Sequence, residues 1–538
     1  MTAALVAAKM GLDVLLVEKT EYFGGTTAWS GGGIWAPGNS LAREAGMDDS
    51  PDLVRQYAQA VVGPTVRDDL LDAFLENVPD AVEFLQENSD VKFSLQEGFP
   101  DWHPDKPGFS ASGRLLMAET FDGRLLGGRL GQMRPPLTEF NAPGGMMLGL
   151  TDMPHIATIK SSWASFRHIA GLLLRYGWDR LRYKRGTRLT MGNALAARLL
   201  HSCDKAGVEL WSNAPMLSLV EEAGSVTGAV IERNGRSLTV KTRRGVILAS
   251  GGFSSNPAMR AQFIPYADHH VSLVSSGNVG DGINNALALG ANYDSDNLSN
   301  AGWVVISVLH EEDGSLRKFP HLFLDRGKPG CIAVNAEGQR FGNESTTNLV
   351  EPMHRTGSVP AHLICDHHFI KRYGLGLVRP GGIGLKKKLL AGYVLRANTL
   401  TELANTIGAN AEKLDATVIR FNEQAERGVD DDFGRGGQES DYSMGDMNHT
   451  PNPCLGPIQH PPFYAVKIFP GDSTTTVGLK VDIKARVLNA DGQAIRGLHA
   501  IGLDMNSLWR GMAPGNGANN TLSLTFGYIA ASALADAN

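Results

Sequence analysis

Cysteine is scarce in this chain of 538 residues, which holds four cysteines scattered through the sequence and no C-x-x-C pair. A disulfide-stapled secreted scaffold needs more cysteines, and a structural zinc site needs them at shorter spacing. The thiols are therefore predicted to be reduced, the location to be cytoplasmic, and no metal site is expected.

Long apolar runs are also missing. No stretch approaches the roughly 18 apolar residues that a spanning helix needs, so no transmembrane segment is expected. The first 17 residues carry Lys9 and Asp13 and follow no charged region, which argues against a secretion signal. A net charge of −6 gives no reason to expect nucleic acid as a partner.

The start of the chain reads as part of a nucleotide-binding unit. Residues 1–10 predict a short helix, 14–17 a buried parallel strand, and Glu18 the acid at its end. Such an acid binds ribose hydroxyls about 20 residues after a G-x-G-x-x-G turn. Counting back places that turn before Met1, so two expectations stay open: a start codon assigned too late, or a polypeptide without this phosphate turn.

A glycine-rich segment follows Glu18. Glycines let a backbone approach a flat ring or a diphosphate, and hydroxyl side chains add donors. Residues 17–39, VEKTEYFGGTTAWSGGGIWAPGN, resemble the second FAD-contact segment of the fumarate reductase and 3-ketosteroid dehydrogenase flavoprotein superfamily. The resemblance implies FAD as cofactor and contacts from Glu18, Lys19, Gly24, Gly25, Thr26, Thr27, Ser30, Gly31 and Gly32.

Later segments resemble the same superfamily in the same order. RGVILASGG ends a strand, SGNVGDG opens a helix, and GMAPGNGANN leads into the last helix. A helix N-terminus there can stabilise an anionic reduced flavin ring. The resemblance adds as cofactor contacts Met216, Ala249, Ser250, Gly251, Gly252, Asn278, Gly280, Asp281, Asp504 and Asn519.

The length predicts two domains. The pattern favours helices within 52–90 and at 191–206, an irregular excursion over 98–168, and a β-meander between about 216 and 248. The resemblance implies an α/β fold, in which a Rossmann-like FAD-binding domain with a β-meander is interrupted by an inserted α+β catalytic (cap) domain. We expect the FAD-binding domain at 1–283 and 461–538 and the inserted domain at 284–460.

The motifs RLTMGNAL, PFYAVKIFPGD and TFGYIAA resemble the 3-ketosteroid 1-dehydrogenase branch most closely. Members of that branch remove two hydrogens from the A-ring of a 3-ketosteroid: a tyrosine takes the proton, another phenol with a backbone N–H polarises the ketone, and FAD takes the hydride. The branch has a Y-P-G-x-G turn where this chain has Ala513-Pro514-Gly515-Asn516-Gly517. Gly517 can still give its N–H, but the phenol is missing, and the tyrosine that follows N-E-(S/A) is not matched within 343–348.

Three side chains are candidates for the missing proton chemistry. His103 falls in an aromatic Y-x-P stretch of relatives and titrates near neutrality, although a surface histidine is the commoner state. Arg326 could deliver a proton as an arginine does in fumarate reductases, or could form an ion pair with Asp325 or Glu344. Tyr464 is a candidate base or a packed aromatic.

The favoured function is an FAD-dependent, 3-ketosteroid Δ1-dehydrogenase-like oxidoreductase with a hydrophobic small-molecule substrate and an electron acceptor that the sequence does not identify. One alternative is a fumarate-reductase-type enoate or enone reductase, and another is a degenerate non-catalytic homologue. The expected pocket is apolar and is formed by stretches that carry Trp102, Phe109, Met117, Met146, Met147 and Phe323.

Overall fold

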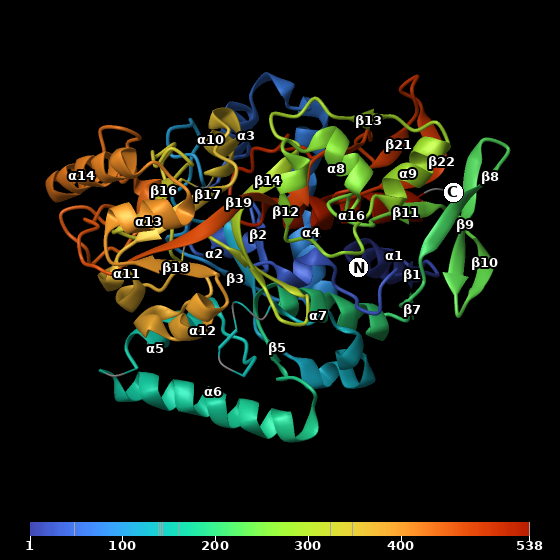
Figure 1. The fold of residues 1–538 in the computed structure, drawn as a ribbon. Coiled ribbons are helices and arrows are strands. Elements are labelled where there is room, and N and C mark those ends of the chain that lie inside the picture. The colour runs from blue at the N-terminus through green and yellow to red at the C-terminus, as the bar shows by residue number, and fades with distance from the viewer. Residues whose placement is uncertain are drawn as a thin grey trace. The chain divides into compact units, whose positions relative to one another are not determined.

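The computed structural model describes residues 1–47, 49–137, 139, 141–142, 144–159, 161–322, 324–346 and 348–536. The chain divides into two compact units. Unit 1 comprises residues 1–256, 275–300 and 475–538, and unit 2 comprises residues 257–274 and 301–474. Figure 1 colours the chain by residue number and shows both units built from helices and sheets.

Unit 1 holds the parallel pairs expected of a nucleotide-binding fold. Strand β1 (Leu15–Val17) pairs in parallel with β7 (Glu209–Trp211), and β11 (Val246–Leu248) pairs in parallel with β22 (Ala494–Ala500). Helix α7 (Met191–Lys205) precedes β7, as a crossover helix does. These pairs confirm the predicted α/β class.

The meander was also predicted correctly. Strands β8 (Met216–Glu222), β9 (Ser225–Arg233) and β10 (Arg236–Lys241) pair antiparallel in sequence order. The turns between them, Ala223-Gly224 and Asn234-Gly235, have positive φ at both residues. Two-residue turns of that kind match the twist of the strands that they join.

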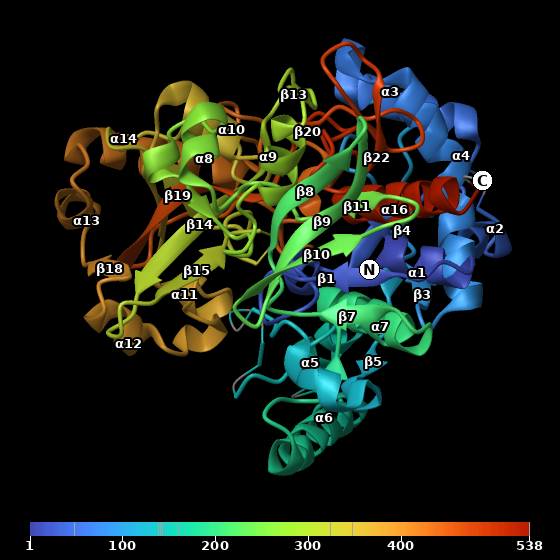
Figure 2. The ribbon, with the colours of Figure 1, turned by 90° about the vertical axis from the view of Figure 1, so that its right-hand side faces the viewer.

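The C-terminal helix forms the centre of the packing in unit 1. Helix α16 (Ala518–Asp536) packs against α1 (Thr2–Lys9), α4 (Asp68–Asn88) and β2 (Gly33–Trp35), as Figure 2 shows for α16 and its two helices. Beside it, the ring of Trp35 stacks on Phe74 at 6.3 Å and meets Trp509 edge-on at 5.4 Å. The remaining elements here are α2 (Ser40–Glu44), α3 (Pro51–Val62), α9 (Asp281–Ala288), β13 (Tyr293–Asp294), β20 (Gly478–Leu479) and β21 (Arg486–Leu488).

The predicted excursion over 98–168 contains more regular structure than its pattern indicated. Strand β4 (Leu115–Ala118) lies between β2 and β3 (Phe93–Leu95), and β5 (Phe121–Asp122) pairs with β6 (Arg188–Leu189). Two helices follow, α5 (Met153–Ala157) and the long α6 (Trp163–Arg182). Both views place α6 at the edge of unit 1, beside α5 (Figures 1 and 2).

Unit 2 is organised around one long strand. Strand β19 (Phe463–Thr475) lies between β14 (Ala301–His310) and β17 (Ala361–Cys365), with β15 (Leu316–Pro320), β16 (Cys331–Val334), β12 (Val271–Ser272) and β18 (Val394–Ala397) completing the sheet. Its helices are α8 (Pro257–Phe263), α10 (Val350–Thr356), α11 (His367–Arg372), α12 (Leu385–Leu390), α13 (Leu400–Ile407), α14 (Ala411–Arg427) and α15 (Glu439–Tyr442).

The units have boundaries that differ from the predicted 283/284 and 460/461. Pairing of β19 with β17 and β18 keeps residues 463–468 in unit 2, and pairing of β12 with β19 brings residues 271–272 into it. Within the described ranges, no helix combines the length and the apolar character needed to cross a membrane.

Candidate flavin site and substrate side chains

The glycine-rich turn after β1 lies against the start of α7. A Cβ on Gly32 would come within 2.3 Å of the carbonyl carbon of Met191, and a Cβ on Gly192 within 2.0 Å of the carbonyl oxygen of Thr27. Gly192 also donates its N–H to the carbonyl oxygen of Ser30 at 3.0 Å. Only glycine permits this approach at positions 32 and 192, so the two segments fix one another.

The other side of the same turn is open. A Cβ on Gly25 or Gly31 would meet no atom within 4 Å, and Gly25 has a φ of +50°. The Thr26 hydroxyl accepts from the Ser275 N–H at 3.3 Å, which ties the turn to the segment before α9. Backbone of this kind leaves room for a flat or diphosphate-bearing group to approach closely.

One contributor to the turn was missed from the sequence. The Asn520 amide donates to the Gly33 carbonyl oxygen at 3.0 Å and to the Ser30 hydroxyl at 3.3 Å. Its carbonyl oxygen accepts from Thr27 Oγ1 at 3.4 Å. The side chain of the neighbouring Asn519, which was predicted, forms no hydrogen bond with the described residues and lies half-buried in the first turn of α16.

The acid at the end of β1 keeps one oxygen for a ligand. Glu18 Oε1 accepts from the N–H and the hydroxyl of Thr20, both at 2.8 Å. Among the described residues, no hydrogen bond engages its Oε2. Lys19 forms an ion pair with Asp281 at 2.7 Å, which joins the end of β1 to the start of α9. Met216 packs nearby with Val17 and Trp211.

A buried carboxylate organises the end of β11. Asp504 accepts from the N–H of Ser250 at 2.5 Å, from its hydroxyl at 2.8 Å, and from the Gly252 N–H at 3.2 Å. Burial raises the pKa of Asp504, and these hydrogen bonds favour its charged form. Asp504 therefore positions the strand end, while Ala249 and Ser250 remain exposed beside it.

The adjacent turn is equally well held. The Asn278 amide donates to the Gly251 carbonyl oxygen at 2.6 Å, and Gly280 donates its N–H to the Gly252 carbonyl oxygen at 2.9 Å. Gly280 has a φ of +77° and immediately precedes α9. All of the predicted cofactor contacts thus lie in unit 1.

These residues fit FAD. Glu18 at the end of β1 supplies an acceptor for ribose hydroxyls. The open backbone at Gly25 and Gly31 lets the diphosphate or ring approach closely, and the N-terminus of α16 supplies the positive end of a helix dipole. FAD held there would accept hydride from a substrate carbon.

His103 lies against the turn at 513–517, where the relatives' tyrosine is replaced by Ala513. His103 Nε2 is 3.1 Å from the Ala513 carbonyl oxygen. The Tyr57 hydroxyl donates to the Pro514 carbonyl oxygen at 2.7 Å and accepts from the His103 N–H at 3.2 Å. Tyr57, which the sequence analysis did not predict, therefore fixes both His103 and the turn. The main-chain N–H of Trp102 also donates to the Pro514 carbonyl oxygen, at 3.0 Å.

Gly517 ends this turn in a conformation that demands glycine. Its φ is +85°, and a Cβ would lie 2.4 Å from both the carbonyl carbon and the carbonyl oxygen of Gly33. Its carbonyl oxygen accepts from Thr521 at 3.1 Å, whereas no described residue accepts from its N–H. The N–H is therefore available to a ligand.

We expect Gly517→Ala to lower both flavin content and turnover by at least about tenfold, because the added methyl forces the turn away from β2. The flavin-to-protein absorbance ratio and the steady-state rate measure the effect. Gly290→Ala is the matched control: Gly290 has a φ of +80° but nothing within 4 Å of a Cβ. Equal effects of the two changes would assign the loss to backbone strain and not to the contact with Gly33.

Arg326 and Tyr464 belong to unit 2. The buried Arg326 guanidinium donates to the main-chain carbonyls of His321, at 2.6 Å, and of Glu344. Burial lowers its pKa to about 10, so it keeps its charge at neutral pH. The guanidinium thus binds main-chain carbonyls and not the carboxylates of Asp325 or Glu344, and a catalytic role for Arg326 stays a prediction.

Tyr464 lies within β19 and is 2% exposed. Its ring packs in the core of unit 2, its hydroxyl lies 3.4 Å from His367 Nδ1, and burial raises its pKa. A higher pKa makes the phenol a weaker acid at neutral pH. This environment is that of the packed aromatic, and a catalytic role for Tyr464 stays a prediction.

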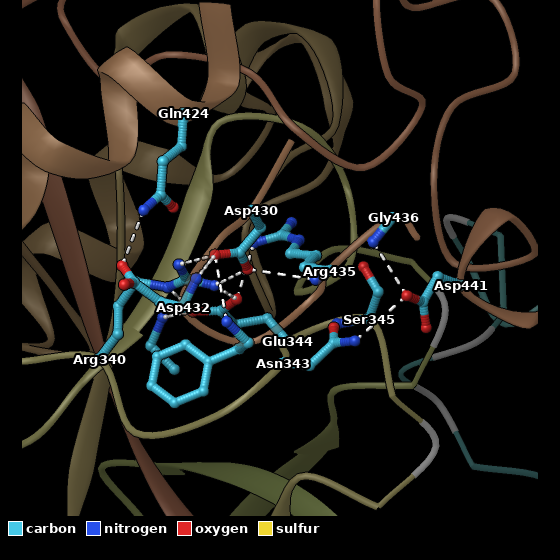
Figure 3. Close-up of polar contacts among 12 residues, drawn as sticks. Arg340, Asn343, Glu344, Ser345, Gln424, Asp430, Asp432, Arg435, Gly436 and Asp441 are labelled. Atoms are coloured by element: carbon cyan, nitrogen blue, oxygen red, sulfur yellow. Dashed lines mark hydrogen bonds and ion pairs between the residues drawn. The ribbon is translucent and has the colours of Figure 1, made fainter. Parts of the chain in front are cut away.

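A buried charge network supports the N-E-S segment of unit 2. Glu344 accepts from Arg340 at 2.7 and 2.9 Å and from Arg435 at 3.0 Å, and Arg340 also pairs with Asp430 at 2.9 Å (Figure 3). Burial alone would raise the pKa of Glu344, but the two guanidinium groups outweigh it and hold that pKa at about 2. Glu344 therefore anchors the segment at residues 343–345 through its two ion pairs.

The predicted pocket side chains differ in exposure. Met146 is buried, whereas Trp102, Phe109, Met117 and Met147 are half-buried. Met147 lines an open groove of about 510 Å³ in unit 1. Phe323, the remaining predicted pocket residue, lies outside the described residues.

Comparison with known proteins agrees with this geometry. A family model described as an FAD binding domain matches residues 1–519. The chain is 37% identical to a 4-oxocyclohex-2-ene-1-carboxylate 5-dehydrogenase of Sinomonas cyclohexanicum, over 98% of this chain and 91% of that protein. It is 34% identical to a 3-oxosteroid 1-dehydrogenase of Mycolicibacterium smegmatis, over 99% and 94%.

Among solved structures, a 3-ketosteroid Δ1-dehydrogenase of Sterolibacterium denitrificans in complex with 1,4-androstadiene-3,17-dione aligns with a TM-score of 0.92 and 36% identity. The alignment covers 100% of this chain and 97% of the other. The predicted superfamily, fold and cofactor are confirmed, and the degenerate alternative is wrong. The chain belongs to the FAD binding domain family, as an FAD-dependent oxidoreductase of its 3-oxosteroid 1-dehydrogenase-like branch.

Proposed function

We propose that this enzyme introduces a carbon–carbon double bond beside the ketone of a six-membered ring. A base takes a proton from the carbon next to the carbonyl, and the neighbouring carbon loses a hydride to the flavin. The products are the conjugated enone, a protonated base and reduced flavin. Two electrons then pass to an acceptor outside this chain. Full-length similarity to dehydrogenases of ring ketones supports the reaction type.

The position of His103 carries the assignment of the base. A carbonyl oxygen only accepts, so the contact with Ala513 places the proton of a neutral imidazole on Nε2 and leaves a lone pair on Nδ1. Burial lowers the pKa of His103, which favours the neutral ring at pH 7. His103 would take the substrate proton, and the free N–H of Gly517 would polarise the ketone.

A 3-ketosteroid is the favoured substrate. The side chains at 102, 109, 117, 146 and 147 are apolar, and a fused-ring hydrocarbon requires such walls. The steroid complex of the solved relative supports this class. A smaller ring bearing a carboxylate is the second candidate, because a relative at 37% identity is a 4-oxocyclohex-2-ene-1-carboxylate 5-dehydrogenase.

The reductase alternative receives less support. It needs Arg326 as a proton donor, and the guanidinium of Arg326 is already used by two main-chain carbonyls. We therefore assign no proton transfer to Arg326. The cytoplasmic location stays a prediction.

Anaerobic bleaching of the flavin distinguishes these substrates. We expect 4-androstene-3,17-dione to reduce the purified yellow enzyme within seconds and to yield the 1,4-diene, while 4-oxocyclohex-2-ene-1-carboxylate reduces it at least about tenfold more slowly, because the small acid buries less apolar surface. The opposite order would establish the second candidate. An enzyme that neither compound bleaches, but that an enone reoxidises after chemical reduction, would instead be a reductase.

A further inference from the structure

Helix α6 carries large apolar side chains that the described residues of unit 1 leave exposed. Trp163, Leu174 and Leu181 are 75%, 77% and 78% exposed, and Leu173 and Trp178 are more than half exposed. Their spacing places them along one side of the helix, together with Phe166. We call these six side chains the outer face of α6.

The opposite side of α6 attaches it to unit 1. Ser165, Ile169 and Asp179 are buried on that side. The Asp179 carboxylate accepts from the N–H and the hydroxyl of Thr187, both at 2.8 Å, and His168 Nε2 lies 2.9 Å from Asp152. The helix is therefore held through its inner side, and the fold does not need the outer face to be apolar.

Cations border the outer face. Because successive helical residues are about 100° apart, Arg180 falls on one flank of the apolar row and Arg175 and Arg182 on the other, while Arg167 lies within it. All four are exposed. The acid of this helix, Asp179, is buried and already hydrogen-bonded. Arg175 forms an ion pair with Asp122 at 3.6 Å, so Arg167, Arg180 and Arg182 make this surface basic in a chain whose net charge is −6.

We propose that α6 docks on the surface of an anionic lipid bilayer, with its outer face among the acyl chains and its arginines at the headgroups. An exposed row of tryptophan, phenylalanine and leucine flanked by arginine is the pattern of a helix lying in the membrane interface. Since its inner side stays packed on unit 1, the helix lies in the membrane plane. A second copy of this chain is a poorer occupant, because it would bring arginines together without an exposed acid on α6 to pair them.

Vesicle flotation of the full-length flavoprotein tests this proposal. We expect the protein to float with vesicles of three parts phosphatidylcholine to one part phosphatidylglycerol, and to float less with phosphatidylcholine alone or at high salt. A Leu174→Glu/Leu181→Glu variant should lose about tenfold or more of its partitioning, because both side chains leave the acyl region. Leu390→Glu, on α12, changes a leucine that is 81% exposed and should bind as the unchanged protein does.

A second variant separates charge from apolar burial. Arg180→Gln/Arg182→Gln should weaken flotation with the anionic vesicles while flavin content stays unchanged. The proposal is overturned if the unchanged protein floats with neither vesicle type, or if the Leu174→Glu/Leu181→Glu variant floats equally well. A dimer in solution that this variant converts to a monomer, without vesicle binding, would assign the outer face to a second copy and also overturn it.

Discussion

His103→Phe is expected to lower kcat by about 10²- to 10⁴-fold, the range that a positioned general base contributes. Phenylalanine keeps a ring against the turn at Ala513 but removes both nitrogens. The substrate should still bind, so KM should change much less than kcat. Stopped-flow flavin reduction under saturating 4-androstene-3,17-dione measures the chemical step directly.

The pH dependence gives an independent check on the same residue. Burial lowers the pKa of His103 below its ordinary value of 6.5, and the base works only in its neutral form. The value of kcat/KM should therefore rise with pH through a pKa below 6.5 and become level above that pKa. In His103→Phe this acid limb should disappear. If kcat/KM of this variant still fell at low pH, the proton would be taken by another group.

Two further variants separate catalysis from positioning. Tyr57→Phe removes the hydroxyl that joins His103 to Pro514, and we expect about a tenfold lower kcat with the acid limb retained, because the imidazole is misplaced but present. His310→Phe changes an exposed histidine at the end of β14 and should leave the rate unchanged. A rate for His103→Phe within about threefold of the unchanged enzyme would exclude His103 as the base.

The sequence identified the glycine-rich turns of the candidate flavin site because local rules govern them, while the residues that contact the cofactor stay a prediction. Glu18 follows a short apolar strand, and the turns at 24–32 and 249–252 need glycine for reasons that neighbouring residues already reveal. The β-meander was predicted correctly as well, and its Asn234-Gly235 turn is one that local sequence favours, whereas Ala223 adopts a positive φ that alanine rarely takes.

Other features depend on contacts that no local pattern encodes. His103 and Ala513 are 410 residues apart, so their contact follows from the packing of unit 1. Asn520 and Tyr57 likewise form hydrogen bonds with residues far away in the sequence, Gly33 and Pro514. Helix α6 escaped prediction because its packed side buries Ser165 and Asp179 beside Ile169 while its exposed side carries the large apolar residues, the reverse of the single buried apolar stripe of an ordinary surface helix.

Glu344→Ala is expected to destabilise the protein by about 3–5 kcal/mol, because it leaves the buried guanidinium groups of Arg340 and Arg435 without their shared carboxylate. Urea unfolding followed by fluorescence measures the loss. Glu337→Ala is the matched control: it breaks an ion pair with Lys413 in which the Glu337 and Lys413 side chains are 60% and 47% exposed, and it should leave the free energy of unfolding nearly unchanged.

Acid should reproduce the effect in the unchanged protein. The pKa of Glu344 is about 2 in the folded chain, below the ordinary value of 4.5, so its contribution to stability is complete above pH 4.5 and is lost as the pH falls towards 2. Glu344→Ala should accordingly show a shallower loss of stability over this interval. Since the network also holds the segment at 343–345, the variant should lose turnover at temperatures where it is still folded. If Glu344→Ala were as stable as Glu337→Ala, the network would have no structural role, and the rigidity of this segment would need another source.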